Sequence, residues 1–424
     1  MSRLRRLGGL FLIVRRSLRQ HALSTAVTLA SAALASGLVM AVFSVNEQTY
    51  DAFTGGPVGF DAVLGARGSQ LQLVLNTVFH LETSPGNIPW ELYTTLRKDP
   101  RVQLAIPYAV GDNYNGFRIV GTTPEMFTEF EYQKGRKLQP QTGGRVFDPG
   151  RREAVIGSTV AQKTGLRVGS TFNPYHGIVF DPSKRHEEEY VVVGVTGVSN
   201  SPSDRVVWIP LEGIFRMEGH VLRGTGSEFQ AKPGEQIDDR HKEVSAVMLK
   251  FKSPQAGFLF DQTINRQGKA ATLAWPIGKV MAELFDKIGW VHRILGLVAY
   301  LVVAVAAGSI LASIYNTMNE RRREFAILRA LGARRRTVFS AIILESTTIS
   351  TLGAVLGYAV YGAIVFGAAV IVRRQTGVAL DPFKFNPSLV FTLVGMSVIG
   401  AGAGVIPALK AYSTDVASNL VADS

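Results

Sequence analysis

Cysteine is absent from the 424 residues of the chain. Its absence excludes disulfide bonds, thiolate metal sites, a cysteine nucleophile and lipid attachment to an N-terminal cysteine. It does not exclude an oxidising compartment, because a domain without thiols has nothing to oxidise to a disulfide. Charge is also scarce, since only 18% of the residues are Asp, Glu, Lys or Arg. With a mean hydropathy of +0.16, this composition indicates membrane-spanning segments combined with a soluble part.

A basic folded domain is lacking as well, although the formal net charge is +12. Residues 1–20 contain six arginines and no acidic residue, and residues 320–336 contain seven arginines and two glutamates. Residues 45–292 contain 27 basic and 27 acidic residues, so their net charge is zero. A nucleic-acid-binding protein carries basic surface on its folded domain. We therefore expect no nucleic acid among the partners.

Four segments with almost no charge are long enough to cross a membrane, which takes about 20 helical residues for about 30 Å of hydrocarbon. They lie between Arg19 and Glu47, between Arg293 and Glu320, between Arg336 and Arg373, and between Lys384 and Lys410. The first could instead be a signal peptide cleaved after small residues such as Ala33 or Ala35. It exceeds the apolar core of a signal peptide, about 7–15 residues, so an uncleaved anchor is predicted.

Arginine-rich loops stay on the cytoplasmic side of a membrane, which orients all four spans in a bacterial cytoplasmic membrane with both termini inside. The predicted organisation is a basic cytoplasmic N-terminus (1–20), a first span (21–45), an extracytoplasmic domain (46–289), a second span (290–317), a cytoplasmic loop (318–336), a third span (337–372), a short outer loop (373–387), a fourth span (388–410) and a cytoplasmic C-terminus (411–424).

The large outer segment has the pattern of a mixed α/β domain. Residues 190–198 and 206–211 are rich in β-branched residues and bounded by Gly, Ser or Pro, which predicts strands. Residues 152–172 predict a strand, a helix, a turn and a second strand. Residues 184–190 and 219–243 are polar and predict loops.

The cytoplasmic loop predicts a short amphipathic helix. Phe325, Leu328 and Leu331 recur at three-residue spacing, which we interpret as one apolar face. Gly332 is placed to end the helix, and three arginines follow it at the membrane surface. Judged by its charge alone, the loop could also be a positively charged segment that fixes the orientation of the spans in the membrane and binds no partner.

The run "ERRREFAILRALGARRRTV" resembles the cytoplasmic loop of FtsX-like permeases, found in the MacB and LolC/LolE group of ABC transporters. The resemblance extends to the closing segment "IPALKAYSTDVASNL", where the family's fourth span ends at a proline and a short helix follows. The segments "REAVIGSTVAQKTGLRVGSTF" and "YVVVGVTGVSNSPSDRVVWIPLEGIF" resemble the periplasmic core domain of MacB-like proteins. The implied fold is an α-helical membrane domain of four transmembrane helices plus an extracytoplasmic mixed α/β domain.

In that family the loop forms a coupling helix that docks on an ATPase subunit. The characteristic pattern is matched by Glu320, Arg321, Glu324, Leu328, Arg329, Gly332 and Ala333. By resemblance, and with the apolar residues added, the coupling residues are Glu320, Arg321, Glu324, Phe325, Leu328, Arg329, Leu331 and Gly332.

The resemblance implies the permease subunit of a type VII ABC transporter that works by mechanotransmission. No G-x-x-x-x-G-K-[ST] segment occurs in the chain, so ATP and magnesium are expected on a separate ATPase subunit and no cofactor on this chain. The permease is expected to form a homodimer, or a heterodimer with a second permease, in membrane lipid; a periplasmic adaptor and the substrate stay open. The alternative is a regulator that transmits ATPase motion to an extracytoplasmic hydrolase.

Two features of the third span are candidates for a structural or functional role. Gly353 and Gly357 have the spacing that allows close helix contact in lipid, either within one subunit or between subunits. Glu345 is an acid within the span, where a charge is costly and is paired or functional. It could reach the cytoplasmic surface or pair with Arg336, and the alternative is a role in transport.

The outer domain shows no pattern of a catalytic or metal site. His176, His186 and residues 187–189 are close in sequence, but no H-E-x-x-H or paired helical spacing is present. We therefore interpret them as a solvated loop. No G-x-S-x-G or comparable nucleophile motif occurs, and we predict no catalytic residue.

Overall fold

The computed structural model describes residues 2–55, 59–217 and 237–413. The chain divides into two compact units. One consists of residues 1–48, 288–369 and 380–424, and the other of residues 49–287 and 370–379. Most of the loop expected at residues 219–243 lies outside the described residues.

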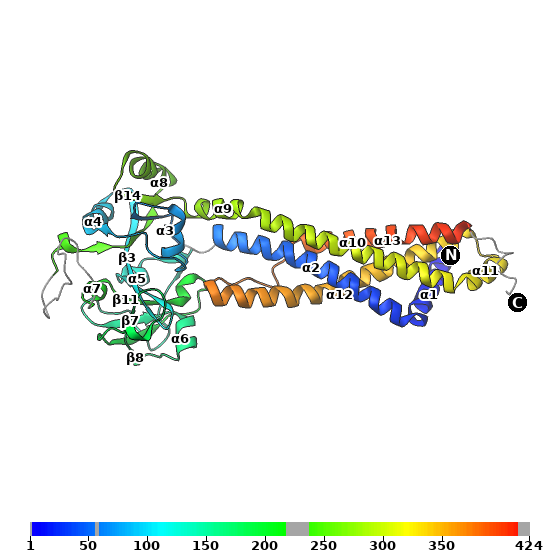
Figure 1. Cartoon of the computed structure of the whole chain (residues 1–424), viewed down its shortest axis with the longest axis horizontal. Helices are drawn as coiled ribbons and strands as arrows, with labels where there is room; N and C mark the ends of the chain where they lie inside the picture. The colour runs from blue at the N-terminus through cyan, green and yellow to red at the C-terminus, as the bar shows by residue number, and fades with distance from the viewer. Residues whose placement is uncertain (1, 56–58, 218–236, 414–424) are drawn as a thin grey trace. The chain divides into compact units, whose positions relative to one another are not determined.

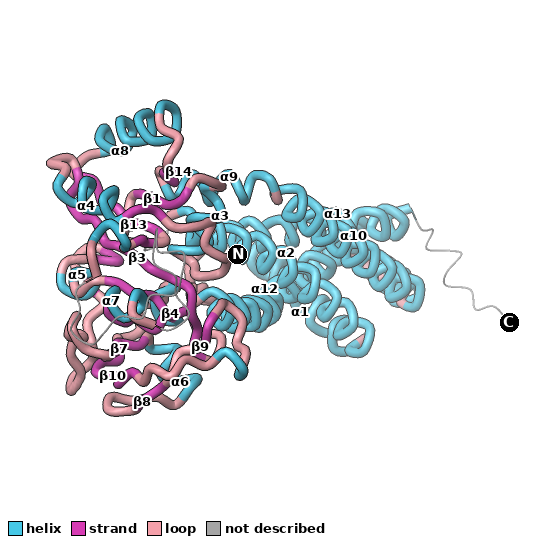
Figure 2. The backbone as a smooth tube through the Cα atoms, turned by 60° about the vertical axis from the view of Figure 1, so that its left-hand side comes forward, coloured by secondary structure: helices cyan, strands magenta, loops and turns pink. Residues whose placement is uncertain are grey.

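The first unit is a helical membrane domain. Within the described residues, four helices are long and apolar enough to cross a membrane: α2 (Ala22–Thr54), α10 (Gly289–Glu320), α12 (Arg335–Thr376) and α13 (Pro387–Ser413). They contain the four apolar segments of the sequence, so the prediction of four spanning helices is confirmed. Figures 1 and 2 show these helices side by side.

Two further helices belong to this unit. Helix α1 (Ser2–Gln20) precedes α2, with His21 between them, and α11 (Arg322–Ala330) follows α10 after Arg321. The closing segment differs from the expectation, because α13 continues through Pro407 to Ser413 instead of ending at the proline. A membrane helix tolerates an internal proline where neighbouring groups satisfy the freed carbonyl. The short helix expected beyond it falls on residues 414–424, outside the described part.

The second unit is a mixed α/β domain, as the sequence predicted (Figure 2). Its main sheet has ten strands in the order β14-β1-β13-β3-β4-β11-β7-β10-β8, with β9 paired to β3. The pairs β11–β4 and β10–β7 are parallel, and the other pairs are antiparallel. These strands are β1 (Ala62–Ala66), β3 (Val102–Tyr114), β4 (Phe117–Thr122), β7 (Glu153–Ile156), β8 (Thr171–Phe172), β9 (Tyr175–His176), β10 (Tyr190–Val195), β11 (Val206–Pro210), β13 (Ala246–Phe251) and β14 (Ala271–Ala274).

Two small sheets and short helices complete the unit. The small sheets pair β2 (Ile88–Pro89) with β12 (Glu243–Val244) and β5 (Glu131–Gln133) with β6 (Arg136–Lys137). The α-helices are α3 (Gln70–Thr77), α4 (Trp90–Lys98), α5 (Glu125–Thr128), α6 (Ser158–Thr164), α7 (Leu211–Phe215), α8 (Pro254–Asp261) and α9 (Ile277–Lys287).

Both faces of the main sheet are buried, which explains the apolar runs in its strands. Successive side chains of a strand point to opposite faces. On β11, Ile209 belongs to one buried cluster and Trp208 to another, and on β4 Ile119 and Val120 are divided in the same way. Strands buried on both faces have continuous apolar runs instead of alternating ones. This is why "VVWIP" could be identified as a strand from sequence.

The predicted order of strand, helix, turn and strand in residues 152–172 is confirmed as β7, α6 and β8. Helix α6 ends at Gly165, whose φ of 76° favours glycine over residues with a Cβ atom. The strand expected at 190–198 is shorter, because β10 ends at Val195. Leu211, expected at the end of a strand, begins α7 instead.

Candidate functional site

Helix α11 is the predicted cytoplasmic helix, and its end is formed as the sequence indicated. Gly332 has a φ of +97°, a left-handed conformation that suits glycine. Its N–H donates to the carbonyl of Arg329 at 3.0 Å, and the N–H of Ala333 donates to the carbonyl of Leu328 at 3.0 Å. These bonds satisfy carbonyls that the last turn would otherwise leave without partners. Gly332 therefore ends α11 sharply.

The apolar residues of this segment do not share one face, unlike the interpretation from their spacing. Phe325 packs against a buried cluster of the membrane domain, and Leu328 is half-buried. Leu331 lies beyond the helix and is 80% exposed. A three-residue step turns a helix by about −60°, so two steps carry a side chain about 120° away. Ile327, which the sequence interpretation overlooked, is 44% exposed, and with Leu331 it supplies exposed apolar surface.

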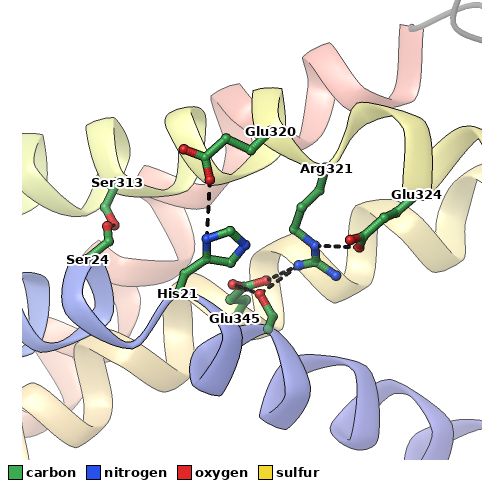
Figure 3. Close-up of polar contacts among 8 residues, drawn as sticks. His21, Ser24, Ser313, Glu320, Arg321, Glu324 and Glu345 are labelled. Atoms are coloured by element: carbon green, nitrogen blue, oxygen red, sulfur yellow. Dashed lines mark hydrogen bonds and ion pairs between the residues drawn. The ribbon is translucent and has the colours of Figure 1, made fainter. Parts of the chain in front are cut away.

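Arg321 is the centre of a buried polar network at the start of α11 (Figure 3). Its Nη1 donates to the hydroxyl of Ser17 on α1 at 2.6 Å and lies 3.6 Å from Oε2 of Glu345 on α12. The Ser17 hydroxyl in turn donates to the Glu345 carboxylate. The Arg321 and Glu345 side chains are only 8% and 10% exposed. One guanidinium thus joins α1, α12 and the turn between α10 and α11.

The two flanking glutamates extend this network toward the surface. Nε of Arg321 donates to Oε2 of Glu324 at 3.0 Å, and the side chain of Glu324 is 48% exposed. Oε2 of Glu320 lies 3.2 Å from Nδ1 of His21, between α1 and α2 (Figure 3). Glu320 and Glu324 are therefore partly accessible to a partner. Arg321 is not, because its exposure is only 7%.

Glu345 has a partner that the sequence did not predict. Arg336 is exposed, and Glu345 pairs with Arg321 instead. Arg336 is the nearest arginine along the chain and is one of two expected ways to accommodate this charge, whereas Arg321 lies in the turn between α10 and α11. A sequence contains no direct signal for a pair formed by two separate helices.

The predicted glycine pair packs inside one chain, against α2. A Cβ atom at Gly353 would lie 2.4 Å from Cβ of Ala32, and one at Gly357 would lie 2.1 Å from Oγ of Ser36. Contacts this close allow only glycine, and they correspond to ordinary packing within one subunit. A Cβ atom at Gly367 would meet nothing within 4 Å.

A second pair of glycines, which the sequence interpretation missed, joins α12 to α13. A Cβ atom at Gly400 would lie 2.3 Å from Cβ of Ser350, and one at Gly404 would lie 2.1 Å from Oγ of Ser346. The Ser350 hydroxyl also donates to the carbonyl of Met396 at 2.5 Å. The signal was present in the sequence, because Gly400 and Gly404 have the same four-residue spacing. Helix α12 is thus packed closely against both α2 and α13.

The polar segment 184–190 is not wholly solvated. Glu187 and Glu189 are exposed, as expected for a loop. His186, however, is buried, and its Nε2 lies 3.2 Å from Oδ1 of Asp112 on β3. The interpretation as a solvated loop is therefore wrong for His186. Asp112 is 74 positions away and buried within the sheet, so the sequence could not pair the two.

Buried contacts around Arg321 connect α11 to the helices of the membrane domain. The buried contacts of Arg321 hold the start of α11 to α1 and α12, and the glycines hold α12 to α2 and α13. A closely packed interior responds to a shift as a connected body, because it has low compressibility. The start of α11 is therefore connected to the spanning helices through buried contacts.

Two known families match different parts of the chain. Residues 296–416 match the FtsX-like permease C-terminal family, and residues 25–254 match the MacB-like periplasmic core domain. The chain is 25% identical over 326 residues to the macrolide export ATP-binding/permease protein MacB of Brucella abortus, covering 74% of this chain and 45% of that protein. A MacB of Hyphomonas neptunium is 30% identical over 132 residues, which cover 31% of this chain and 19% of that protein.

Other relatives are permeases without an assigned role. An uncharacterized ABC transporter permease of Mycobacterium tuberculosis is 26% identical over 141 residues, covering 33% of this chain and 36% of that protein. Among solved structures, the periplasmic region of MacB from Actinobacillus actinomycetemcomitans aligns with 54% of this chain and 94% of that one, with 11% identity and a TM-score of 0.33. The matches cover less than half of the length of each of these curated relatives.

Proposed function

Because this chain belongs to the family of FtsX-like ABC transporter permeases with a MacB-like periplasmic core domain, we propose that it is the permease subunit of an ATP-driven exporter. In this proposal α11 docks on a cytoplasmic ABC ATPase subunit, and the permease works as a homodimer or a heterodimer. The substrate leaves the inner membrane or the periplasmic side without a hydrophilic channel through the four helices.

The observation that carries the proposal is the contrast between the two sides of α11. One side is fixed, because Arg321 is buried among Ser17, Glu324 and Glu345. The other side presents the apolar side chain of Ile327 to solvent, and Leu331, directly after the helix, is exposed as well. A helix anchored on one side and apolar on the other is suited to receive a partner and pass on its motion.

The route across the membrane follows two long helices. The last residues of α2, from Thr49, and those of α12, from Val370, belong to the α/β unit. Both helices are continuous up to these residues. Helix α12 is tied to the start of α11 through Arg321 and Glu345, and α2 packs against α12 at Gly353 and Gly357. We propose that ATP-driven movement of α11 reaches the α/β domain along α2 and α12 and changes its conformation.

The orientation follows from charge. The arginines of residues 1–20 and 320–336 favour the cytoplasmic side, so α1, α11 and both termini lie inside and the α/β domain lies outside. The match to a MacB-like periplasmic core domain supports export over the control of an extracytoplasmic hydrolase. The family name of the relatives does not assign a substrate to this chain.

Mutation of the exposed side of α11 tests the proposal. Truncation of a buried interface anchor commonly costs about 2 kcal/mol or more. We therefore expect Leu331→Asp and Ile327→Asp each to weaken binding of the partner ATPase subunit by more than about tenfold. Phe383→Asp is the matched control, since Phe383 is 94% exposed but belongs to the loop before α13.

Binding is measured with the purified permease in lipid nanodiscs. Neither substitution disturbs insertion, because acidic residues contribute little to topology. If Leu331→Asp and Ile327→Asp bind the ATPase as the unmodified chain does, α11 is not the docking site, and the assignment as an ATPase-coupled permease loses its support.

A further inference from the structure

Three side chains of the α/β domain form a cluster outside the proposed docking site on α11. Asp112 lies on β3, His176 on β9, and His186 in the segment that precedes β10. Oδ1 of Asp112 lies 3.2 Å from Nε2 of His186 and 3.3 Å from Nδ1 of His176. One ligand atom from each of the three residues lies within 4.8 Å of the other two. Two imidazole nitrogens and one carboxylate oxygen thus converge on one place.

The backbone fixes this convergence. Asp112 is paired directly with His176 in the ladder between β3 and β9. The register between β3 and β4 shifts between Val110 and Asn113, so Asp112 lies in an irregular part of the strand. Such irregularities re-aim side chains and occur next to functional sites.

The segment that contains the histidines is held by side-chain amides. Nδ2 of Asn113 donates to the carbonyl of Gly177 at 2.9 Å, just after His176. The N–H of His186 donates to the carbonyl of Pro174 at 2.9 Å, and Nδ2 of Asn173 donates to the carbonyl of His186 at 3.3 Å. The two histidines are therefore positioned by several bonds that do not involve their rings.

The two separations from Asp112 match the spacing of neighbouring ligands around a small metal ion. Zinc binds imidazole nitrogen and carboxylate oxygen at about 2.0–2.2 Å, so neighbouring ligands of a tetrahedral site are about 3.3–3.5 Å apart. The two separations measured from Asp112 are 3.2 and 3.3 Å. Nitrogen and oxygen ligands of this kind suit zinc, nickel or copper(II), whereas calcium and magnesium prefer oxygen ligands alone.

Burial divides the cluster into a fixed side and an open side. The side chains of Asp112 and His186 are 0% and 6% exposed, and that of His176 is 49% exposed. An ion could therefore enter beside His176, and a fourth ligand could approach from solvent there. Sites with three protein ligands and an open position accept water or an external ligand.

We propose that Asp112, His176 and His186 form a binding site for a divalent transition-metal ion in the α/β domain, with a fourth coordination position open to solvent. The site would exchange its ion through the exposed His176. It is independent of the coupling helix and of ATP hydrolysis, so its test does not depend on the transport assignment.

The test measures zinc binding by the full-length chain in nanodiscs, purified with a tag that contains no histidine and freed of metal with a chelator. Equilibrium dialysis against buffered Zn²⁺, followed by elemental analysis, gives the bound amount. We expect one zinc ion per chain, and a loss of affinity of at least about tenfold in His176→Ala, because loss of supporting residues alone costs 10–100-fold. His241→Ala is the matched control, since His241 belongs to the same unit but not to the cluster.

Two further measurements keep the proposal falsifiable. Because His176 is exposed, His176→Ala is expected to fold, which circular dichroism checks. Replacement of zinc by Co²⁺ is expected to give the visible absorption of a low-coordinate nitrogen and oxygen site in the unmodified chain and not in His176→Ala. The proposal is overturned if the unmodified chain binds no stoichiometric zinc, or if His176→Ala binds it equally well. In that case the cluster is a structural contact between an aspartate and two histidines.

Discussion

Substitution of Arg321 by methionine removes a buried positive charge and leaves the carboxylate of Glu345 without its positively charged partner. Both side chains are nearly buried, at 8% and 10% exposure. Removal of one member of a buried ion pair costs about 3–5 kcal/mol, because the remaining charge is left in a medium of low dielectric constant. Arg321→Met also removes the bonds to Ser17 and Glu324. We therefore expect a loss of stability of this order.

The double variant Arg321→Met with Glu345→Leu tests whether the stability lost in Arg321→Met is due to the unpaired charge of Glu345 or to lost packing. Replacement of both members of a buried pair by apolar residues of similar volume is often neutral or stabilising. The double variant is therefore expected to regain most of the stability lost by Arg321→Met. Arg323→Met is the control, because Arg323 is an exposed arginine of α11, and surface changes usually stay within about 0.5 kcal/mol.

The assay is thermal unfolding of the purified chain in nanodiscs, together with ATP hydrolysis by its complex with the ATPase. Arg321→Met is expected to lower both the melting temperature and the coupled hydrolysis. The reasoning is refuted if Arg321→Met melts like Arg323→Met, or if the double variant is less stable than Arg321→Met alone.

Three other outcomes are expected. Gly353→Leu should weaken folding or assembly because a side chain there collides with Ala32, whereas Gly367→Leu should matter little; equal tolerance in a stability assay would contradict the close packing of α2 and α12. In this cysteine-free chain, Lys134→Cys should react with an impermeant maleimide in intact spheroplasts and Thr337→Cys should not; the reverse pattern would contradict the orientation. Burial lowers the pKa of His80 to about 3, with help from Arg118 and Arg205. Below the ordinary histidine pKa of about 6.5, the unfolded state therefore binds more protons than the folded state. As the pH is lowered from 6.5 to 3, the free energy of unfolding should fall by up to about 1.4 kcal/mol per pH unit. His80→Asn, which tolerates the φ of 55°, should reduce this pH dependence in denaturant titrations, and an unchanged slope would contradict it.

The elements that could be predicted from sequence are those governed by local patterns. The four spans follow from uncharged segments, β11 from its run of β-branched residues, and the end of α11 from Gly332. The residues that could not be predicted act across long separations. Arg321 and Ser17 are 304 positions apart, and Ser17 and Glu345 are 328 apart.

The errors have physical causes of the same kind. Nearness in sequence makes Arg336 one of the two expected ways to accommodate the charge of Glu345, the other being the cytoplasmic surface, whereas the fold brings Arg321 to it. Three-residue spacing predicts Leu331 on the face of Phe325, but each such step falls about 60° short of a full turn, and Leu331 lies beyond α11. The charged neighbours of His186 predict a position in solvent, whereas the side chain is buried and contacts Asp112 on β3.

Hydrogen–deuterium exchange of residues 322–333 tests the central claim, that α11 receives the motion of an ATPase, most directly. The unmodified permease in nanodiscs is measured alone, with the ATPase, and with the ATPase and a non-hydrolysable ATP analogue. The account predicts that the ATPase slows exchange in residues 322–333, and that the nucleotide then alters exchange in the α/β domain of the unmodified chain but not of Arg321→Met. Unchanged exchange in residues 322–333 when the ATPase is bound would contradict it.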